Sequence, residues 1–432
     1  MAGDVSTFNR AEGWSVAIYW INFNDWWCSA ADVQSLAIAV CGYNSAMRNW
    51  LLPEFIEDVL PAEAARIESL RRQLLDLFQV HGYQYVIPPM LEYMESLITG
   101  TGYDLDLATF KVVDQLTGRL MGVRADMTPQ AARIDAHMLN HQGVSRLCYA
   151  GTVLRTKPDG LARTREPLQL GAELFGHAGI ESDVEIQRLM IKSLQLLGLK
   201  ELHIDFSHVG IFECLVHQAQ LDTPLEQALF AALQSKDKSA VTQLVQHLDS
   251  ALQRAFVQLV ELNGDVSVLS KAAAALPNLD AIQQALTELQ AIAKHLADLD
   301  VQVGFDLSEL RGYHYHSGIV FAAYAHGYAG PIALGGRYDE VGVAFGRARP
   351  ATGFSLDLRG AVLALAPAQL EKAILAPVGS DPNLLKMIES LRSDGQIVIQ
   401  ALPNISTDLN ELNCDRTLEL KQGEWCVTPI SH

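Results

Sequence analysis

Asp126 and Thr128 are the first side chains in the sequence whose types and spacing could do chemistry. They lie between the end of a predicted strand at Val123 and a predicted helix that carries Arg133. A carboxylate and a hydroxyl at a strand end both accept hydrogen bonds, so together they could hold an ammonium group. A helix N-cap explains either residue equally well, because Pro129 suits the first helical turn.

A second stretch combines an arginine with two polar residues of one predicted strand. Arg155 follows a strand predicted over Leu147–Leu154, and a loop separates it from Gln169 and Glu173. An arginine at a strand end can hold an anionic group through two hydrogen bonds. Because side chains alternate along a strand, the four-residue spacing places Gln169 and Glu173 on one face, where they could line a polar pocket. An exposed sheet face is the alternative.

A third stretch, Arg311–Gly318, places four ring-bearing residues in succession after an arginine and a glycine. Among them, Tyr315 and His316 could form a stacked, hydrogen-bonding pocket for a small aromatic or imidazole ligand. A fourth stretch, Gly335–Asp339 followed by Gly353–Gly360, has paired glycines that allow a ligand to approach the backbone or a tight turn to form.

Two histidine pairs could in principle bind zinc: His314 with His316, and His137 with His141, four residues apart on a predicted helix. Zinc sites need three or four protein ligands, and neither pair comes with an obvious third. We therefore expect no metal at this site, and no other cofactor.

The elements that must position these residues alternate between helices and strands from about residue 54 onward. Apolar residues at steps of three and four between Ile67 and Leu77 predict a helix that begins near Pro61 and ends near Gly82. Turns containing glycine separate the strands, which favours an α+β fold with a mostly antiparallel sheet flanked by helices. The predicted strands are Tyr85–Ile87, Leu147–Leu154, His203–Phe206, Val301–Phe305 and Ile319–Ala323.

Composition divides the chain into four parts. Residues 47–221 and 300–370 carry the strands and form the predicted core. Residues 222–299 are rich in Ala, Leu and Gln with helical spacing, which predicts an all-helical insertion. Residues 371–432 read as β–α–β, a small α/β appendage, and residues 1–46 form an N-terminal extension.

The extension has a composition of its own. It holds four of the six tryptophans and no lysine, and no periodicity lasts more than a few residues. A signal peptide would need a basic start, a longer apolar core and a small-residue cleavage site. Two interpretations stay open: an aromatic docking segment, or an extension upstream of a natural start at Met47, which we favour.

The composition of the whole chain excludes several classes of protein. Hydrophobic residues make up 49%, which rules out global disorder, and the net charge of −18 argues against a polyanion as main partner. Six cysteines without a CxxC pair fit reduced thiols in the cytoplasm. No apolar run approaches the ~20 residues of a membrane span.

In their order along the chain, the four stretches resemble the core of class II aminoacyl-tRNA synthetases, and in particular histidyl-tRNA synthetases, from about Leu52 to about Leu365. Gly82–Glu92 is similar to the first class II motif, whose proline-ended strand packs at the dimer interface. Arg311–Gly318 resembles the histidine-recognition signature, and Gly335–Asp339 matches the stretch before the third motif. The second motif is matched by Arg155, Arg163, Arg165, Gln169, Leu170, Gly171, Glu173, Phe175 and Gly176.

The chain departs from this family where ATP would bind. Lys157 stands where the second motif has a glutamate that accepts from the adenine amino group. In the third motif, Arg359 occupies the acidic position and Gly360 the position of the arginine that grips the terminal phosphate. Where the signature reads Arg-Gly-Leu-Asp-Tyr-Tyr-Thr-Gly, residues 311–318 read Arg-Gly-Tyr-His-Tyr-His-Ser-Gly, which alters two of its side-chain roles, at His314 and His316. One such electrostatic group is typically worth ~3 kcal/mol in the transition state, so we expect no histidine adenylation and no catalytic residue.

A synthetase-like chain that keeps part of the amino-acid pocket but has these departures resembles the regulatory subunits of ATP phosphoribosyltransferase, which are catalytically inactive paralogues of histidyl-tRNA synthetase. The resemblance implies dimers of this chain within a hetero-oligomer, in which a short-form catalytic subunit performs the first step of histidine biosynthesis and histidine is the candidate effector. An active histidyl-tRNA synthetase and another synthetase-like sensor of tRNA or amino acids are the alternatives. Nine acidic and five basic side chains between Glu371 and His432, a net charge of −4, argue against tRNA.

The resemblance also implies roles for individual residues. Glu173 would accept from the imidazole N–H of histidine, Asp126 and Thr128 would hold its ammonium group, and Gln169 and Arg311 would face its carboxylate. The full candidate set for histidine binding is Asp126, Thr128, Arg155, Gln169, Glu173, Arg311, Tyr315 and His316.

Overall fold

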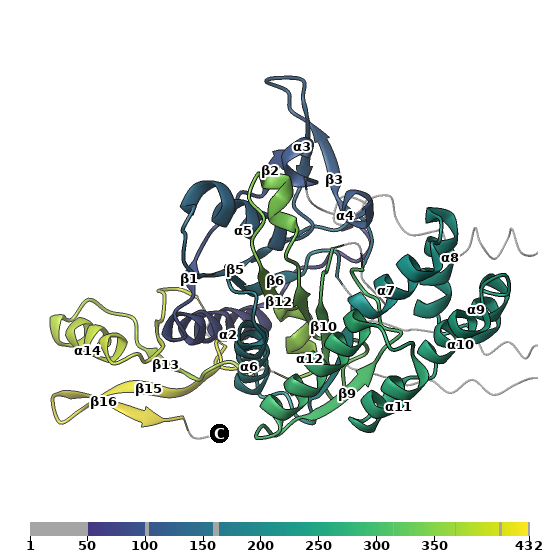
Figure 1. The fold of residues 1–432 in the computed structure, drawn as a ribbon. Helices are drawn as coiled ribbons and strands as arrows, with labels where there is room; N and C mark the ends of the chain where they lie inside the picture. Colours follow the sequence, from purple (N-terminus) through teal and green to yellow (C-terminus); the bar gives the residue numbers. More distant parts are fainter. Residues whose placement is uncertain are drawn as a thin grey trace, which may run out of the picture. The chain divides into compact units, whose positions relative to one another are not determined.

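The computed structural model describes residues 51–99, 103–158, 164–313, 315–367, 369–405 and 408–430 (Figure 1). The chain divides into two compact units, Met1–Glu54 and Phe55–His432, and the described helices and strands lie in the second. Three features singled out from the sequence fall outside the described residues: the extension 1–46, Arg163 and His314.

A nine-stranded mixed sheet forms the centre of the fold, as the α+β prediction requires. Six of its neighbouring pairs are antiparallel, and only β1–β5 and β7–β9 are parallel. Across the sheet the strands are β1 (Gln84–Tyr85), β5 (Ser145–Thr152), β6 (Leu168–Phe175), β12 (Ala351–Asp357), β11 (Ala333–Arg337), β10 (Ile319–Tyr324), β7 (His203–His208), β9 (Gln302–Asp306) and β8 (Asn263–Gly264).

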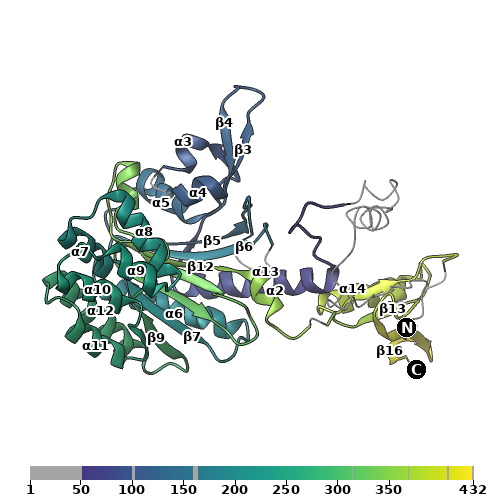
Figure 2. The same ribbon diagram turned by 90° about the vertical axis from the view of Figure 1, so that its right-hand side faces the viewer.

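Helices cover one face of this sheet (Figures 1 and 2). Residues of the other face line a cavity. Alternation along β6 makes the division: Leu170, Ala172 and Leu174 join the large apolar core, while Phe175 joins a smaller cluster. Burial of the apolar side chains of the large core supplies most of the stabilisation of the folded state. The helices whose apolar residues build the large core include α2 (Pro61–Val80), α6 (Ile180–Leu196), α7 (Val209–Ala219), α12 (Asp280–Leu296) and α13 (Leu358–Leu363).

The first helix and strand follow the sequence prediction closely. Helix α2 begins at Pro61 and buries Ile67, Leu74 and Phe78, and Gly82 follows it with a φ of +86°. Strand β1 is shorter than predicted and ends at Tyr85, although the Val86 N–H still donates to the Cys148 carbonyl.

A second, three-stranded sheet lies above the open face and was not predicted (Figure 2). It is antiparallel and has the order β2 (Leu91–Tyr93), β4 (Leu120–Val123), β3 (Phe110–Val113). The short helical elements of this part of the chain, and one from the later core, are α3 (Met94–Leu97), α4 (Tyr103–Ala108), α5 (Thr128–Arg133), the π-helical turn η2 (Ile134–Leu139) and the 3₁₀ turn η3 (Val341–Phe345).

The predicted helical spacing of His137 and His141 is wrong. Asn140 adopts a left-handed conformation and ends η2, so His141 lies beyond the helix. Because η2 is a π-helical turn, the four-residue rule of an α-helix does not apply to it. Among the described residues, no group of three metal-ligating side chains comes together.

The insertion is helical with one exception. Strand β8 interrupts it and pairs with β9 at the edge of the large sheet, so the expectation of helices throughout is wrong at that point. Aspartates at 222, 237 and 249 accept from backbone N–H groups at three helix starts, as N-caps do. Besides α12, the helices are α8 (Thr223–Gln234), α9 (Lys238–Leu244), α10 (Ser250–Leu259) and α11 (Ser267–Ala275). The domain boundaries themselves stay a prediction.

The C-terminal segment forms a separate four-stranded sheet with its own apolar core. The predicted β–α–β unit consists of β13 (Ala373–Ala376), α14 (Pro382–Ser393) and β14 (Val398–Gln400), with the two strands parallel. A hairpin that the sequence did not predict extends this sheet through β15 (Cys414–Lys421) and β16 (Glu424–Pro429). In the part of the chain that the structure describes, no helix has the length and apolar character to cross a membrane.

Candidate functional site

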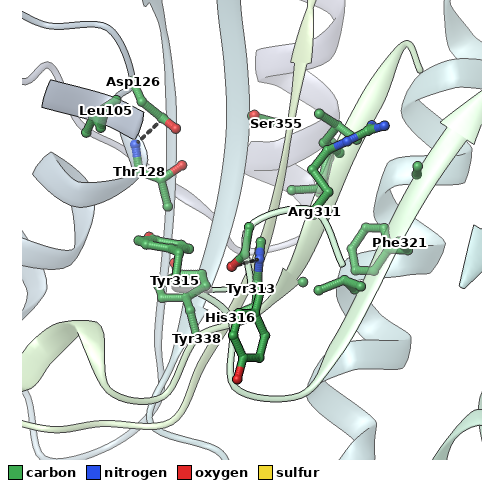
Figure 3. A pocket seen from close by; sticks show the side chains of 18 of the residues that line it. Leu105, Asp126, Thr128, Arg311, Tyr313, Tyr315, His316, Phe321, Tyr338 and Ser355 are labelled. Carbon is green, nitrogen blue, oxygen red and sulfur yellow. Dashed lines mark hydrogen bonds between the residues drawn. The ribbon is translucent and has the colours of Figure 1, made fainter. Parts of the chain in front are cut away.

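A cavity of about 650 Å³ opens on the face of the large sheet opposite its core helices (Figure 3). Seven of the eight predicted residues line it, although they come from four separate parts of the chain. They are Asp126, Thr128, Arg155, Glu173, Arg311, Tyr315 and His316.

Glu173 is the most buried charged group of the cavity, with 1% of its surface exposed. Tyr149 donates to its Oε1 at 2.8 Å, and Tyr338 donates to its Oε2 at 2.5 Å. Burial raises the pKa of this carboxyl to about 8, although both tyrosine hydrogen bonds act in the opposite direction. Glu173 is therefore mostly protonated at neutral pH.

Glycine on the neighbouring strand makes room for this carboxyl group. Gly353 pairs with Glu173 across β12 and β6, and a Cβ at Gly353 would lie 1.5 Å from Glu173 Oε2. The tyrosines and this glycine complete the site. Their direct contacts with Glu173 were not predicted from the sequence, although Tyr338 belongs to a predicted stretch and Gly353 begins another.

Asp126 and Thr128 lie at one wall of the cavity, and Gln169 lies behind them. The Asp126 Oδ1 atom accepts from the Thr128 N–H at 2.9 Å and from Gln169 Nε2 at 2.8 Å. Gln169 Oε1 also accepts from the Met127 N–H, and the residue is only 3% exposed. The prediction that Gln169 lines the pocket is wrong, because both ends of its amide bind protein groups; it holds Asp126 in place instead.

The ring-bearing stretch forms the other side of the cavity. The ring of Tyr315 lies 5.1 Å from that of Tyr338 and 5.3 Å from that of His316, centroid to centroid. The Tyr315 hydroxyl is buried and has no hydrogen-bond partner among the described residues. A buried hydroxyl without a partner costs free energy, so a ligand that bonds to it is favoured.

His316 is neutral in this environment. Burial lowers its pKa to about 4, and its Nδ1–H donates to the Gly312 carbonyl at 3.2 Å. Its Nε2 atom is therefore an acceptor. The ring fits because Gly336 has no side chain: a Cβ there would lie 2.6 Å from the His316 ring.

Three basic side chains also line the cavity. Arg155 and Lys157 come from the end of β5 and the loop after it, and Arg311 pairs with Glu309. Arg155 Nε also donates to the Ala125 carbonyl at 3.3 Å. The cavity is thus lined by both acceptors and cations, which suits a small ligand with an ammonium and a carboxylate group.

The two departures in the third motif leave the cavity without a cation from that motif. Arg359 does not line it and donates instead to the backbone carbonyls of Glu166 and Glu57 at 3.2 and 3.3 Å. At Gly360, a Cβ would lie 2.4 Å from the Tyr328 hydroxyl, so an arginine could not be placed there without moving that ring.

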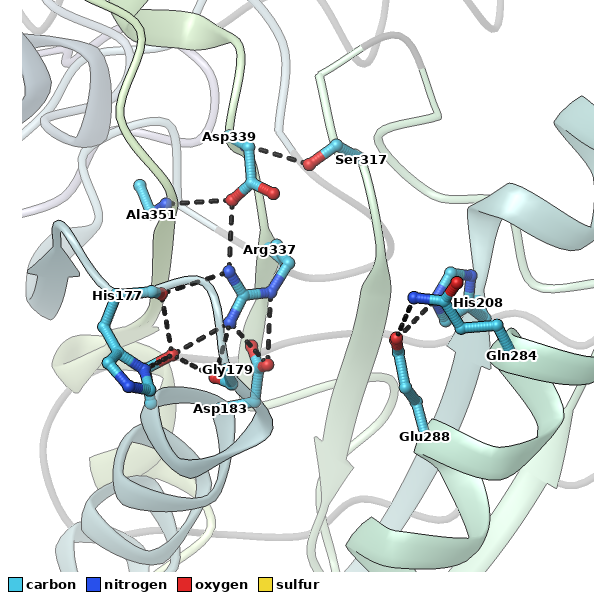
Figure 4. Close-up of polar contacts among 11 residues, drawn as sticks. His177, Gly179, Asp183, His208, Gln284, Glu288, Ser317, Arg337, Asp339 and Ala351 are labelled. Carbon is cyan, nitrogen blue, oxygen red and sulfur yellow. Dashed lines mark hydrogen bonds and ion pairs between the residues drawn. The ribbon is translucent and has the colours of Figure 1, made fainter. Parts of the chain in front are cut away.

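A buried ion pair fixes strand β11, which leads into Tyr338. Asp183 Oδ2 accepts from Arg337 Nη2 at 2.6 Å, and the two side chains are only 3% and 8% exposed (Figure 4). Arg337 also donates to Asp339 and to backbone carbonyls of His177 and Gly179. None of the five lines the cavity, so this cluster is structural.

The fold and cavity define a class of protein. A mostly antiparallel sheet that carries the ligand-facing residues of the four stretches on one face is the core of a class II aminoacyl-tRNA synthetase. Residues 55–361 match the family model described as histidyl-tRNA synthetase. A solved structure described as an ATP phosphoribosyltransferase regulatory subunit/histidyl-tRNA synthetase from Bacillus halodurans has a TM-score of 0.76 and 26% identity, and the match covers 85% of this chain and 97% of that one.

Three further matches narrow the class of protein. Residues 371–428 match the C-terminal domain of the ATP phosphoribosyltransferase subunit HisZ. The ATP phosphoribosyltransferase regulatory subunit of Methylobacillus flagellatus is 67% identical over 381 residues, 88% of this chain and 98% of that protein. The one from Cupriavidus metallidurans is 55% identical over 88% of this chain and 99% of its own length. The chain belongs to the family of ATP phosphoribosyltransferase regulatory subunits.

Proposed function

We propose that this chain is a non-catalytic subunit that activates a short-form ATP phosphoribosyltransferase and makes it sensitive to histidine. The complex would be cytoplasmic and would contain dimers of this chain. Membership of the family supports the regulatory role. The observation that supports histidine as the ligand is the buried Tyr315 hydroxyl, which has no hydrogen-bond partner within the described part of the chain and belongs to a residue that lines the same cavity as Glu173.

Histidine would fit the cavity in one orientation. Its ammonium group would bind Asp126 and Thr128, because the bonds that hold Asp126 both use Oδ1 and Oδ2 can still accept. Its imidazole would meet Glu173 and the Tyr315 hydroxyl, and its carboxylate would face Arg311. Each contact pairs opposite charges or completes a hydrogen bond.

Isothermal calorimetry with the isolated chain tests this ligand assignment. We expect histidine to bind with one site per chain, and histidinol, which lacks the carboxylate, to bind more weakly. Imidazole alone should bind weakest, because it contacts only the Glu173 end. Equal affinities for histidine and histidinol would contradict the carboxylate contact, and absence of histidine binding would contradict the assignment.

We predict that the chain alone catalyses no histidine-dependent exchange of pyrophosphate into ATP. Lys157 offers no acceptor for adenine, and the cation that the third motif would supply is absent at Gly360. Losing two such groups should lower the rate by about 10⁴-fold or more. A radiolabelled exchange assay measures this, with an active histidyl-tRNA synthetase as control. Exchange at the rate of the control would show that the chain is an enzyme.

We predict that histidine affinity rises with pH between 7 and 8.5. The pKa of Glu173 is raised to about 8, so ionisation of the carboxyl group in this range creates a better acceptor for the imidazole N–H. If only the ionised form binds, affinity should increase up to about eightfold. Calorimetry at several pH values measures the slope, and Glu173→Gln should flatten it. An affinity that falls over this range would mean that protonated Glu173 is the binding form.

A further inference from the structure

Tyr313 connects the ring-bearing stretch of the cavity to the helical insertion. Its hydroxyl donates to Glu226 Oε1 of helix α8 at 3.0 Å. Its ring lies 5.1 Å from that of Phe212 on α7, edge to face, and 5.8 Å from that of Phe230 on α8. Phe212 is fully buried, so the ring of Tyr313 is held between a fixed helix and the insertion.

Helix α8 also forms part of the cavity wall. Phe230 and Gln234 line the cavity together with Tyr313 itself. Glu226, Phe230 and Gln234 follow one another at intervals of four, so they lie on one face of the helix. The same face therefore contacts both the cavity and the residue that anchors the stretch.

The far end of the stretch is held differently. The Ser317 N–H donates to the Arg337 carbonyl at 2.8 Å, and Ser317 Oγ accepts from the Asp339 N–H at 2.9 Å. Arg337 is locked in the buried pair with Asp183. One end is thus tied to the rigid sheet, and the other is tied to a partly exposed helix.

We infer that Tyr313 is a positioning residue through which a ligand in the cavity and helix α8 stabilise each other. This inference rests on the proposed histidine site. A ligand that contacts Arg311 and Tyr315 orders the turn between them, the turn holds Tyr313, and Tyr313 holds Glu226. By linkage, whatever stabilises α8 against the core also raises ligand affinity by the same factor.

Hydrogen–deuterium exchange of the α8 amides, with and without saturating histidine, tests the coupling. In the unmodified chain, histidine should slow exchange in residues 223–234. Tyr313→Phe keeps the ring and removes the hydroxyl, so we expect it to abolish this histidine-dependent slowing and to raise the Kd about three- to tenfold. Glu226→Ala should do the same, whereas Glu226→Gln keeps an acceptor and should restore both properties. Gln227→Ala, an exposed neighbour on α8, is the matched control and should change neither.

The outcomes separate this inference from the ligand assignment. If the unmodified chain does not bind histidine, the proposed site is wrong. If it binds histidine but α8 exchange is unaffected, or if Tyr313→Phe leaves both the affinity and the slowing unchanged, the coupling through Tyr313 is wrong while the site stands. Loss of affinity in Tyr313→Phe but not in Glu226→Ala would also overturn the coupling, because it would show that the bond to α8 carries none of it.

Discussion

At pH 8.5, where most of the Glu173 carboxyl is ionised, replacing this residue with alanine should weaken histidine binding by about 1.5–3 kcal/mol, the usual value of a hydrogen bond to a charged group. Glu173 is buried in the floor of the cavity and was assigned, by resemblance, to the imidazole of histidine. Calorimetry on the isolated chain measures the affinity. Inhibition of the assembled enzyme by histidine should weaken in parallel, because an effector acts only through its differential affinity for two states.

Two further variants keep this prediction testable if alanine disturbs the core. Alanine leaves the Tyr149 and Tyr338 hydroxyls without their partner, so Glu173→Gln, which retains a hydrogen-bonding group, should be measured beside it. Glu288→Ala is the matched control. Glu288 lies on helix α12, its carboxylate is bonded to His208 at the end of β7, and neither residue lines the cavity. Histidine affinity that is unchanged in both Glu173 variants would move the regulatory site elsewhere.

Replacing Asp183 with alanine should lower the free energy of unfolding by about 3–5 kcal/mol. The substitution leaves the Arg337 guanidinium buried with only part of its compensation. Denaturant unfolding followed by circular dichroism measures the change. Arg188 and Asp298 form a more exposed pair at 2.6 Å, so Asp298→Ala is the control and should cost less than ~1 kcal/mol.

A double substitution separates charge burial from packing. Asp183→Leu combined with Arg337→Met removes both charges, and buried pairs replaced in this way are often no less stable. We therefore expect the double variant to be markedly more stable than Asp183→Ala. A single variant as stable as the unmodified chain would show that Arg337 finds its compensation in Asp339 and the carbonyl groups alone.

The parts of the fold that depend on local patterning could be predicted from the sequence. Helix α2 follows from its apolar spacing and its proline, and most strands of the large sheet follow from apolar runs bounded by glycine turns. Strands β2 and β3 are short, and their residues are half-buried or exposed, so they lack the pattern that marks a buried strand. The hairpin of β15 and β16 is likewise mostly half-buried or exposed.

The residues of the candidate site show a second limit of prediction from the sequence. Even spacing on β6 correctly places Gln169 and Glu173 on one face of a strand, but it cannot show how deeply each side chain is buried. For Gln169, the hydrogen bonds to Asp126 and from Met127 hold the side chain behind the cavity wall. Tyr149 and Gly353 reach Glu173 through strand register. The pairing of Asp183 with Arg337 spans 154 residues, so no local pattern marks it.

We propose that this chain activates a catalytic partner and makes it sensitive to inhibition by histidine. The most direct test of this proposal is the initial rate of phosphoribosyl-ATP formation by the short-form catalytic subunit alone, with this chain, and with this chain plus histidine. We expect co-elution of the two chains, a higher rate in the complex, and inhibition by histidine that Glu173→Ala weakens. A rate that this chain does not change, or inhibition by histidine that is the same with and without it, would rule out this regulatory function.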